Sequence, residues 1–319
     1  MEIVKAIISD IPEIVELLKK SLGEKLMPKS EAFFIWKHFQ NPFGESVIWL
    51  AKEEGKIIGI RAFMCWRWMN KDGYCNAVRA VDTATDPAFQ GKGIFSKLTM
   101  KAIETSMENN IDFVFNSPNK ISIKGYLKLG WYSNGKMPMM VKPVFRWPVK
   151  NLDIQIQKGY DFFSVQKAID LLGDGWELKN NTAFYCTPLS KSYLKWRYQN
   201  CPVADYGAII EPNHFGLVFR LKKRGQFIEC RICEIWLEDP LAVDDIKIAM
   251  NKLIQLVKPL VLTCAPSLRG EHDKLIKIGF WGPFNIGPEI TLRTIANNNL
   301  NNFNQYFSWA PSLGALELF

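Results

Sequence analysis

Two glycines, Gly91 and Gly93, have the spacing that points most directly to chemistry. They follow a β-branched run at residues 78–85 that is typical of a strand, and Pro87 ends this run because proline cannot donate a ladder hydrogen bond. The residues after Gly93 place apolar side chains at helical spacing. Since the first N–H groups of a helix have no internal partner, this turn could bind an anion such as a diphosphate, and glycines would let it approach the backbone.

The glycine pair alone also fits an ordinary strand-to-helix turn. A dinucleotide-binding loop would need a third glycine three residues on, a P-loop would need Gly-Lys-Ser/Thr, and neither follows here. The longer stretch at residues 87–94, Pro-Ala-Phe-Gln-Gly-Lys-Gly-Ile, resembles motif A of the GCN5-related N-acetyltransferases (GNAT), whose core is Arg/Gln-x-x-Gly-x-Gly/Ala. In that family the loop amides hold the pyrophosphate of acetyl-CoA. Phe95 departs from the family's usual Gly or Ala and narrows the space over the loop.

A second GNAT signature follows at residues 119–131, in the order that the family has. It consists of Asn119, the small residue Ser122, Tyr126 and a closing Lys-Leu-Gly-aromatic. The resemblance implies that Tyr126 is the general acid that protonates the departing thiolate, and the ordinary phenol pKa of about 10 suits that task. Packing of Tyr126 on the sheet as a plain helix residue is the alternative.

The resemblance also implies how the cosubstrate acetyl-CoA is bound. Strand backbone would bond the pantetheine arm, the loop would hold the diphosphate, Lys92 would add a point charge, and Asn119 would contact the arm or cap its own helix. The implied cosubstrate-binding residues are Thr83, Ala84, Thr85, Gln90, Gly91, Lys92, Gly93, Ile94, Phe95, Ser96 and Asn119. No metal site is expected, because Cys230 and Cys233 would point to opposite faces of a strand and no histidine lies near them.

The base that takes a proton from an ammonium acceptor is less clearly indicated by the sequence than the general acid is. Asp82, on the strand that leads to the turn, and Glu31, at the start of a predicted helix after Ser30, are the candidates. Each also fits a solvated or ion-paired carboxylate, and Glu31 would favour a helix N-terminus. A water chain or a backbone carbonyl could take the proton instead. Of the two carboxylates, we assign Asp82 to the catalytic site together with Tyr126.

The composition is that of a globular protein, and 319 residues suffice for two domains. Hydrophobic residues make up 48% of the chain, yet no apolar run is long enough to span a membrane. The net charge of +8 is spread among acidic residues, which indicates a solvated surface rather than a nucleic-acid-binding one. Seven dispersed cysteines favour reduced thiols and a cytoplasmic location.

Strand patterns precede and follow the glycine turn. They fall at residues 2–7, 47–52, 56–64 and 112–116, with a hairpin turn at Glu54-Gly55. The chain changes character around residues 142–150, where two prolines fall. We therefore predict one domain at residues 1–145 and a second at residues 146–319.

Short sequence segments of the first half recur in the second half in the same order. The pairs are residues 34–37 with 194–197, 86–87 with 239–240, 116–118 with 264–266, and 129–131 with 278–280. The second copy has no glycine turn, and Asp244 and Asp245 stand at its expected helix start, where their charge would repel a pyrophosphate. We predict an α/β (α+β) fold of two tandem GNAT-like domains, each a mixed, mostly antiparallel sheet flanked by helices, in which only the first binds CoA.

Tandem domains with Gly-Lys-Gly-Ile-Phe-Ser in the first resemble the enhanced-intracellular-survival acetyltransferases, and the likeness covers roughly residues 1–295. Members of that group acetylate amines, including aminoglycosides. Their terminal carboxylate reaches the active site, which here implies Phe319. The further carrier-like domain of that group is missing from this sequence.

These patterns predict a cytoplasmic N-acetyltransferase that uses acetyl-CoA. The expected acceptor is the primary amine of a small molecule, such as an amino sugar, an aminoglycoside-like compound or a polyamine, which attacks the thioester directly in a ternary complex. Trp36, Trp49, Trp66 and Trp68 could stack on a sugar or fill a core. The alternatives are an aminoacyl- or longer-acyl transferase of the tandem kind and a non-catalytic acyl-CoA-binding module. No nucleic-acid or membrane partner is expected, and a homo-oligomer stays open.

Overall fold

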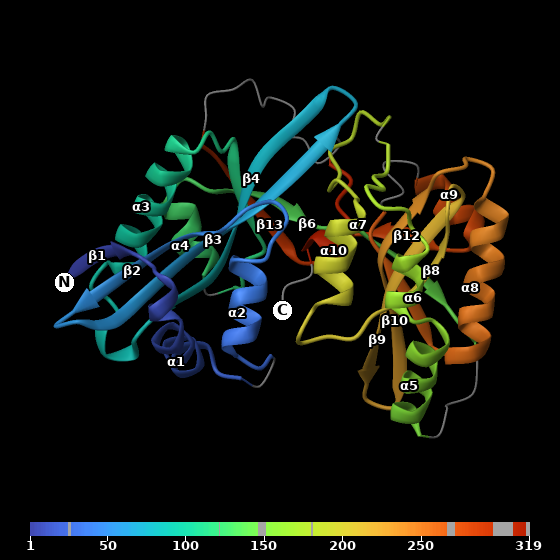
Figure 1. Cartoon of the computed structure of the whole chain (residues 1–319), viewed down its shortest axis with the longest axis horizontal. Helices are drawn as coiled ribbons and strands as arrows, with labels where there is room; N and C mark the ends of the chain where they lie inside the picture. Colours follow the sequence, from blue (N-terminus) through green and yellow to red (C-terminus); the bar gives the residue numbers. More distant parts are fainter. Residues whose placement is uncertain are drawn as a thin grey trace.

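The computed structural model describes residues 1–24, 27–120, 122–145, 151–179, 181–266, 272–295 and 309–316. Figure 1 shows two halves side by side, each built on one mixed sheet flanked by helices, which confirms the predicted fold class. Within the described part of the chain, no helix combines the length and the apolar character needed to cross a bilayer.

The first half begins with a strand and two helices and then forms most of a seven-stranded sheet. Its elements are β1 (Glu2–Lys5), α1 (Ile11–Leu22), α2 (Glu31–His38), β2 (Val47–Glu53), β3 (Lys56–Asn70), β4 (Gly73–Thr85), α3 (Ile94–Glu108), β5 (Phe113–Asn116), α4 (Ile123–Lys128), β6 (Tyr132–Lys136) and β7 (Met139–Pro143). The predicted hairpin is confirmed, because Glu54 and Gly55 turn between β2 and β3 with φ of 51° and 78°. Helix α2 begins where predicted, since the Ser30 hydroxyl accepts the N–H of Phe33 at 3.2 Å.

The second half repeats this order of elements. It contains α5 (Leu152–Phe162), α6 (Val165–Asp170), α7 (Lys191–Leu194), β8 (Gly207–Glu211), β9 (Phe215–Arg224), β10 (Phe227–Leu237), α8 (Val243–Val257), β11 (Val261–Cys264), α9 (His272–Ile278), β12 (Trp281–Phe284), β13 (Glu289–Thr294) and α10 (Leu313–Leu316). From α7 to β12 the elements follow the same sequence as from α2 to β6. Helix α10 touches both halves, and Figure 1 places it between them.

The two halves exchange a strand. The first sheet has the order β1-β2-β3-β4-β5-β13-β6, so β13 of the second half lies between β5 and β6. The second sheet has the order β12-β7-β11-β10-β9-β8, so β7 of the first half lies between β11 and β12. The division of the sequence at residue 145 stays a prediction, and the sheets do not follow it, because each is completed by a strand from across that division.

One cluster of buried apolar residues contains residues of both halves, and several tryptophans belong to it, whereas each sheet also has apolar clusters of its own. The indoles of Trp36 and Trp196 stack with ring centroids 5.0 Å apart, and each indole N–H donates to the backbone carbonyl of the other residue at 2.8 Å. These residues occupy matching places in the recurring words of the sequence. Trp36, Trp66 and Trp68 are buried here, so they fill the core rather than present a surface to a sugar.

Candidate active site

The predicted glycine turn is present and exposed at the end of β4. Asp86 ends the strand, and its carboxylate accepts the N–H of Ala88 at 3.1 Å while pairing with Lys20. Gly91 and Gly93 adopt φ of 78° and 74°, in the left-handed region that favours glycine. A Cβ added at either position would meet no other atom within 4 Å. Open space therefore lies over the loop just before the N-terminus of α3.

Some side chains of the predicted loop residues pack against the protein, and the others are exposed beside the turn. Ile94 is buried and contacts the sheet at Gly59, so its side chain anchors the start of α3. Phe95 packs against α4 and its ring lies 5.6 Å from that of Tyr126, rather than over the loop. Lys92 stays exposed, with its ammonium 4.6 Å from the ring of Phe89. Gln90 and Ser96 are also exposed beside the turn.

Beyond residue 79, β4 continues toward the turn without pairing to β5, and we call the region beside this unpaired edge the gap. Their parallel pairing covers only residues 77–79 and 113–115, whereas β4 continues to Thr85. Thr83, Ala84 and Thr85 still pair with β3 on the other edge of the strand. The edge that faces the gap can therefore bond an extended ligand in the manner of an added strand.

A β-bulge distorts β4 beside the gap. Asp82 is the extra residue of the bulge and has a positive φ of 38°. Its buried carboxylate pairs with the ammonium of Lys37 and bonds Nε2 of His38 at 2.8 Å. Burial alone would raise the pKa of Asp82, but the charge of Lys37 and the His38 hydrogen bond outweigh it and hold that pKa well below its ordinary value. Asp82 thus lies on β4 next to Thr83, and its carboxylate is held in an ion pair with Lys37.

Glu31, the other candidate base, lies exposed in the first turn of α2. Asn119 accepts the N–H of Ser122 through its side-chain oxygen at 2.8 Å, so it contacts the start of α4. The carboxylate of Phe319 lies outside the described residues.

Arg61 is a site residue that sequence reasoning missed. It stands on β3 with none of its surface exposed, and its guanidinium donates to the Tyr126 hydroxyl at 2.8 Å and to that of Thr83. No carboxylate in the described parts of the chain pairs with it, and its Nε and one terminal nitrogen have no partner there. A buried cation without a counter-ion is costly, so such a group suits a place where negative charge develops. A lone arginine in the apolar run of residues 57–66 was the available signal.

The Arg61 contact fixes the role of the Tyr126 hydroxyl. Guanidinium carries donors only, so the phenol oxygen must accept from Arg61 and keeps its own proton for another acceptor. The ring is held by edge contacts with Phe95 and Trp131 at 5.6 and 5.3 Å between centroids. The Tyr126 side chain is therefore held in one orientation, and its hydroxyl proton is not used by Arg61.

The end of the chain fills the corresponding region of the second half. Every described residue from 309 to 316 is buried. Arg197, at the place that matches Lys37, donates twice to the carbonyl of Gly314, at 3.1 and 3.0 Å. From the first half, Arg79 donates to the carbonyls of Ala315 and Leu316 at 2.8 and 2.7 Å. We call residues 309–316 the C-terminal strap.

Glu234 is a second polar contact of the strap in the second half, beside Arg197. Its carboxyl oxygen accepts from the hydroxyls of Tyr198 and Ser312, each at 2.7 Å. Burial raises the pKa of Glu234, in contrast to the lowered pKa of Asp82. Gly314 is required here, because a Cβ would lie 1.7 Å from the Tyr198 hydroxyl.

Raising the pH should lower the stability of the protein through the buried carboxyl of Glu234. The folded pKa of Glu234 exceeds its unfolded value, so folding retains a proton that the unfolded chain releases, and stability falls as pH rises from the ordinary glutamate pKa through the raised one. Glu234→Gln keeps an acceptor oxygen and cannot ionise. Urea titrations at about pH 5 and about pH 8 should show a smaller loss of unfolding free energy in this variant than in the wild type. Equal losses would contradict the assignment.

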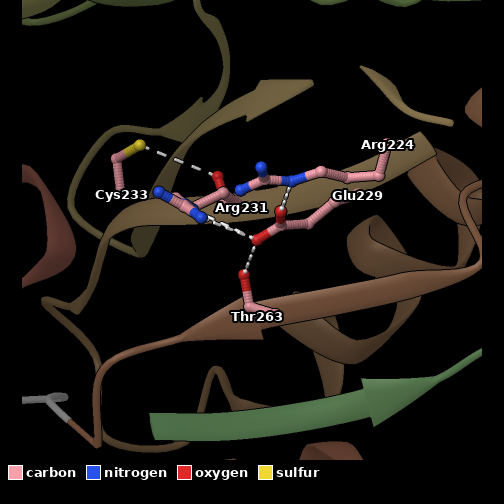
Figure 2. Close-up of polar contacts among 5 residues, drawn as sticks. All are labelled: Arg224, Glu229, Arg231, Cys233 and Thr263. Carbon is pink, nitrogen blue, oxygen red and sulfur yellow. Dashed lines mark hydrogen bonds and ion pairs between the residues drawn. The ribbon is translucent and has the colours of Figure 1, made fainter. Parts of the chain in front are cut away.

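The second sheet uses its matching arginine differently, as Figure 2 shows. Arg231 has the register of Arg79, since the two residues pair with β11 and β5 at equivalent positions. Instead of reaching the strap, it donates to Glu229 at 3.0 Å, and that carboxylate also accepts from Arg224 and Thr263. These cations lower the pKa of Glu229 to about 2 although its burial would raise it. This cluster joins β9, β10 and β11 through the carboxylate of Glu229.

Comparisons with known proteins identify the family of the first half. Residues 2–133 match the family model described as an acetyltransferase (GNAT) domain. This part of the chain belongs to the GNAT acetyltransferases. The chain is thus an N-acetyltransferase, and acetyl-CoA is its cosubstrate, as the two sequence motifs predicted. No curated protein sequence gave a significant match.

Solved structures show the same fold over both halves. A GCN5-related N-acetyltransferase from Anabaena variabilis aligns with a TM-score of 0.61 at 12% identity, covering 92% of this chain and 73% of that one. A probable N-acyltransferase from Enterococcus faecalis gives 0.61 at 9% identity, with 92% and 72% covered. Eis1 from Mycobacterium abscessus gives 0.54 at 9% identity, with 92% and 74% covered.

Proposed function

We propose that this GNAT protein transfers the acetyl group of acetyl-CoA to a primary amine of a small molecule, in the gap between β4 and β5. The observation that supports this most is the juxtaposition of an exposed glycine turn, an unpaired strand edge and a buried proton donor. The turn offers the amides of α3 to a diphosphate, and Thr83, Ala84 and Thr85 offer strand backbone to the pantetheine arm. The thioester would then lie near Tyr126 and Arg61.

The transfer needs one bond formed and one broken. The amine nitrogen bonds to the carbonyl carbon of the thioester, the carbon–sulfur bond breaks, and CoA leaves as a thiolate. The Tyr126 hydroxyl gives its proton to the sulfur, and the Arg61 guanidinium stabilises the negative charge on the phenol oxygen as it does so. The attacking amine loses its own proton to water.

Asp82 is assigned a supporting part in this scheme. A carboxylate whose pKa is held so low accepts a proton weakly, so we propose that it fixes Lys37 and His38 at the bulge instead of acting as the base. The lowered pKa of His38, which burial causes, keeps that imidazole neutral.

The second half would act as a GNAT-like copy without cosubstrate. Asp244 and Asp245 stand in the first turn of α8, where the first half has its glycine turn, and the strap fills the interior next to Glu234.

The seven cysteines are free thiols, which suits a reducing compartment such as the cytoplasm.

A non-catalytic acyl-CoA sensor would need the turn and the gap but not a poised proton donor. The contact between Arg61 and Tyr126 favours catalysis over sensing. Release of free thiol from acetyl-CoA, measured across a panel of primary amines, separates the two. CoA binding without amine-dependent thiol release from any amine would leave the sensor as the better proposal.

Gly91→Asp should weaken CoA binding at least tenfold. The new carboxylate would stand beside the diphosphate position, as Asp244 does in the second half. Gly55→Asp is a matched control, because Gly55 has the same φ of 78° and equally open space, but lies at the β2–β3 turn. Calorimetric titration of both variants with CoA measures the effect. Equal affinities of the two variants would place the diphosphate elsewhere.

A further inference from the structure

We propose that the acceptor carries an anionic group, a carboxylate or a phosphate, and that Lys29 binds this group in a pocket beside Asp82. This inference rests on the proposed function and names the substrate class of the same site. It departs from the polycationic acceptors that the family resemblance implied.

The pocket lies between α1, the start of α2 and the bulge of β4. Its apolar wall includes Val15, Leu18 and Phe33, and its charged wall consists of Lys29, Lys37 and Asp82. Because Asp82 belongs to both the pocket and the bulge, the pocket meets the strand whose next residue, Thr83, borders the cosubstrate gap. A small molecule held here would have its amine near the thioester.

The charges of this pocket do not cancel. Lys37 is paired with Asp82 and its ammonium lies 4.4 Å from the ring of Phe33, so these two charges offset one another. Burial lowers the pKa of His38, which leaves the imidazole uncharged. The ammonium of Lys29 forms no ion pair with any described residue. Within the pocket lining, Lys29 and Lys37 therefore bring two positive charges against the one negative charge of Asp82. Glu24, whose carboxylate also acts on the charge of Lys29, lies outside the lining.

Lys29 is held where a ligand could reach it. It is half-buried, and burial lowers the pKa of its ammonium. Its backbone N–H donates to the carboxylate of Glu24 at 3.0 Å, which fixes the chain before α2 while Glu24 itself stays exposed. An anion at Lys29 would balance the positive charge of the pocket lining, whereas a polyamine or aminoglycoside would bring further ammonium groups next to it.

Pairs of amines that differ only in charge test the proposal. One pair is an amino acid and its carboxamide, and the other is an amino sugar phosphate and its parent amino sugar. We expect at least tenfold higher kcat/KM for the anionic member of at least one pair in thiol-release assays. The pair that shows the preference identifies the anion as carboxylate or phosphate.

Three variants assign the preference to Lys29. Lys29→Gln should reduce it to near unity, and Lys29→Arg should retain most of it because the charge stays. Lys19→Gln is the control, since Lys19 lies on α1, pairs with Glu16 and does not line the pocket. Thermal melting verifies that each variant folds. A preference that survives Lys29→Gln would overturn the proposal.

The assay results distinguish a failure of the anionic-acceptor proposal from a failure of the acetyltransferase proposal. Turnover that favours neutral or cationic amines would contradict the proposal of an anionic acceptor, and acetyl transfer itself would still be supported. If no amine turns over, binding of the same pairs in the presence of CoA decides, measured by calorimetry. Equal or absent binding of the anionic members there would also overturn the role of Lys29.

Discussion

Tyr126→Phe should lower kcat more than tenfold while the KM for acetyl-CoA changes little. The phenol ring packs between Phe95 and Trp131, and phenylalanine keeps these contacts. What the variant loses is the proton that Arg61 leaves available, so the departing sulfur must leave as a bare thiolate or take a proton from water. General acid catalysis of this kind is worth roughly 10²–10⁴ in rate.

The measurement is steady-state thiol release at saturating amine, with thermal melting to verify the fold. Tyr74→Phe is the control, because Tyr74 is exposed on β4 and contacts Arg67 rather than the gap. Arg61→Met removes the guanidinium that donates to the Tyr126 hydroxyl, and this variant should also have a lower kcat. Wild-type kcat in Tyr126→Phe would remove Tyr126 from the mechanism and return it to a packing role.

Gly287→Val should destabilise the whole protein, by about 3 kcal/mol in unfolding free energy. Gly287 lies where the exchanged strands cross: its N–H donates to the carbonyl of Met137 at 3.0 Å, and the Met137 N–H donates to Pro288 at 2.9 Å. A Cβ on Gly287 would lie 2.5 Å from the Met137 carbonyl oxygen, which is backbone and cannot swing aside. The two strands would have to separate, and each sheet would loosen at the inserted strand.

Gly173→Val is a suitable control for this substitution. A Cβ on Gly173 would meet no atom within 4 Å, and neither glycine has a positive φ, so the comparison isolates the crossing. Urea unfolding measures the difference between the two variants. A Gly287→Val protein as stable as Gly173→Val would mean that the crossing tolerates a side chain.

The local parts of the site could be predicted from the sequence. The glycine turn and Tyr126 belong to short sequence motifs whose local conformation depends on their own residues. The structure has the left-handed glycines and the helix that these motifs predict, whereas the binding and catalytic roles stay predictions. The catalytic role of Asp82 stays a prediction. Its partners Lys37 and His38 come from helix α2, far from Asp82 in the sequence, and the residues next to Asp82 do not indicate them. Arg61 depends in the same way on residues far along the chain.

The strand exchange could not be predicted from the sequence. The alternation of side chains indicates a strand but does not say which sheet it joins, and β7 and β13 carry similar apolar patterns at the ends of two similar halves. The strap escaped prediction for a related reason. Its apolar residues indicate burial, whereas its position follows from carbonyl contacts to Arg79 and Arg197, which no side-chain pattern encodes.

The C-terminal strap also limits how the enzyme can move. Its backbone carbonyls are held by a guanidinium from each half, Arg79 on one side and Arg197 on the other. A hinge between the halves would have to break one of these buried sets of contacts, at a cost of about 1.5–3 kcal/mol for each hydrogen bond to a charged group. We therefore expect substrate entry to depend on local motion near α1 and α2, with the two halves turning as a single body.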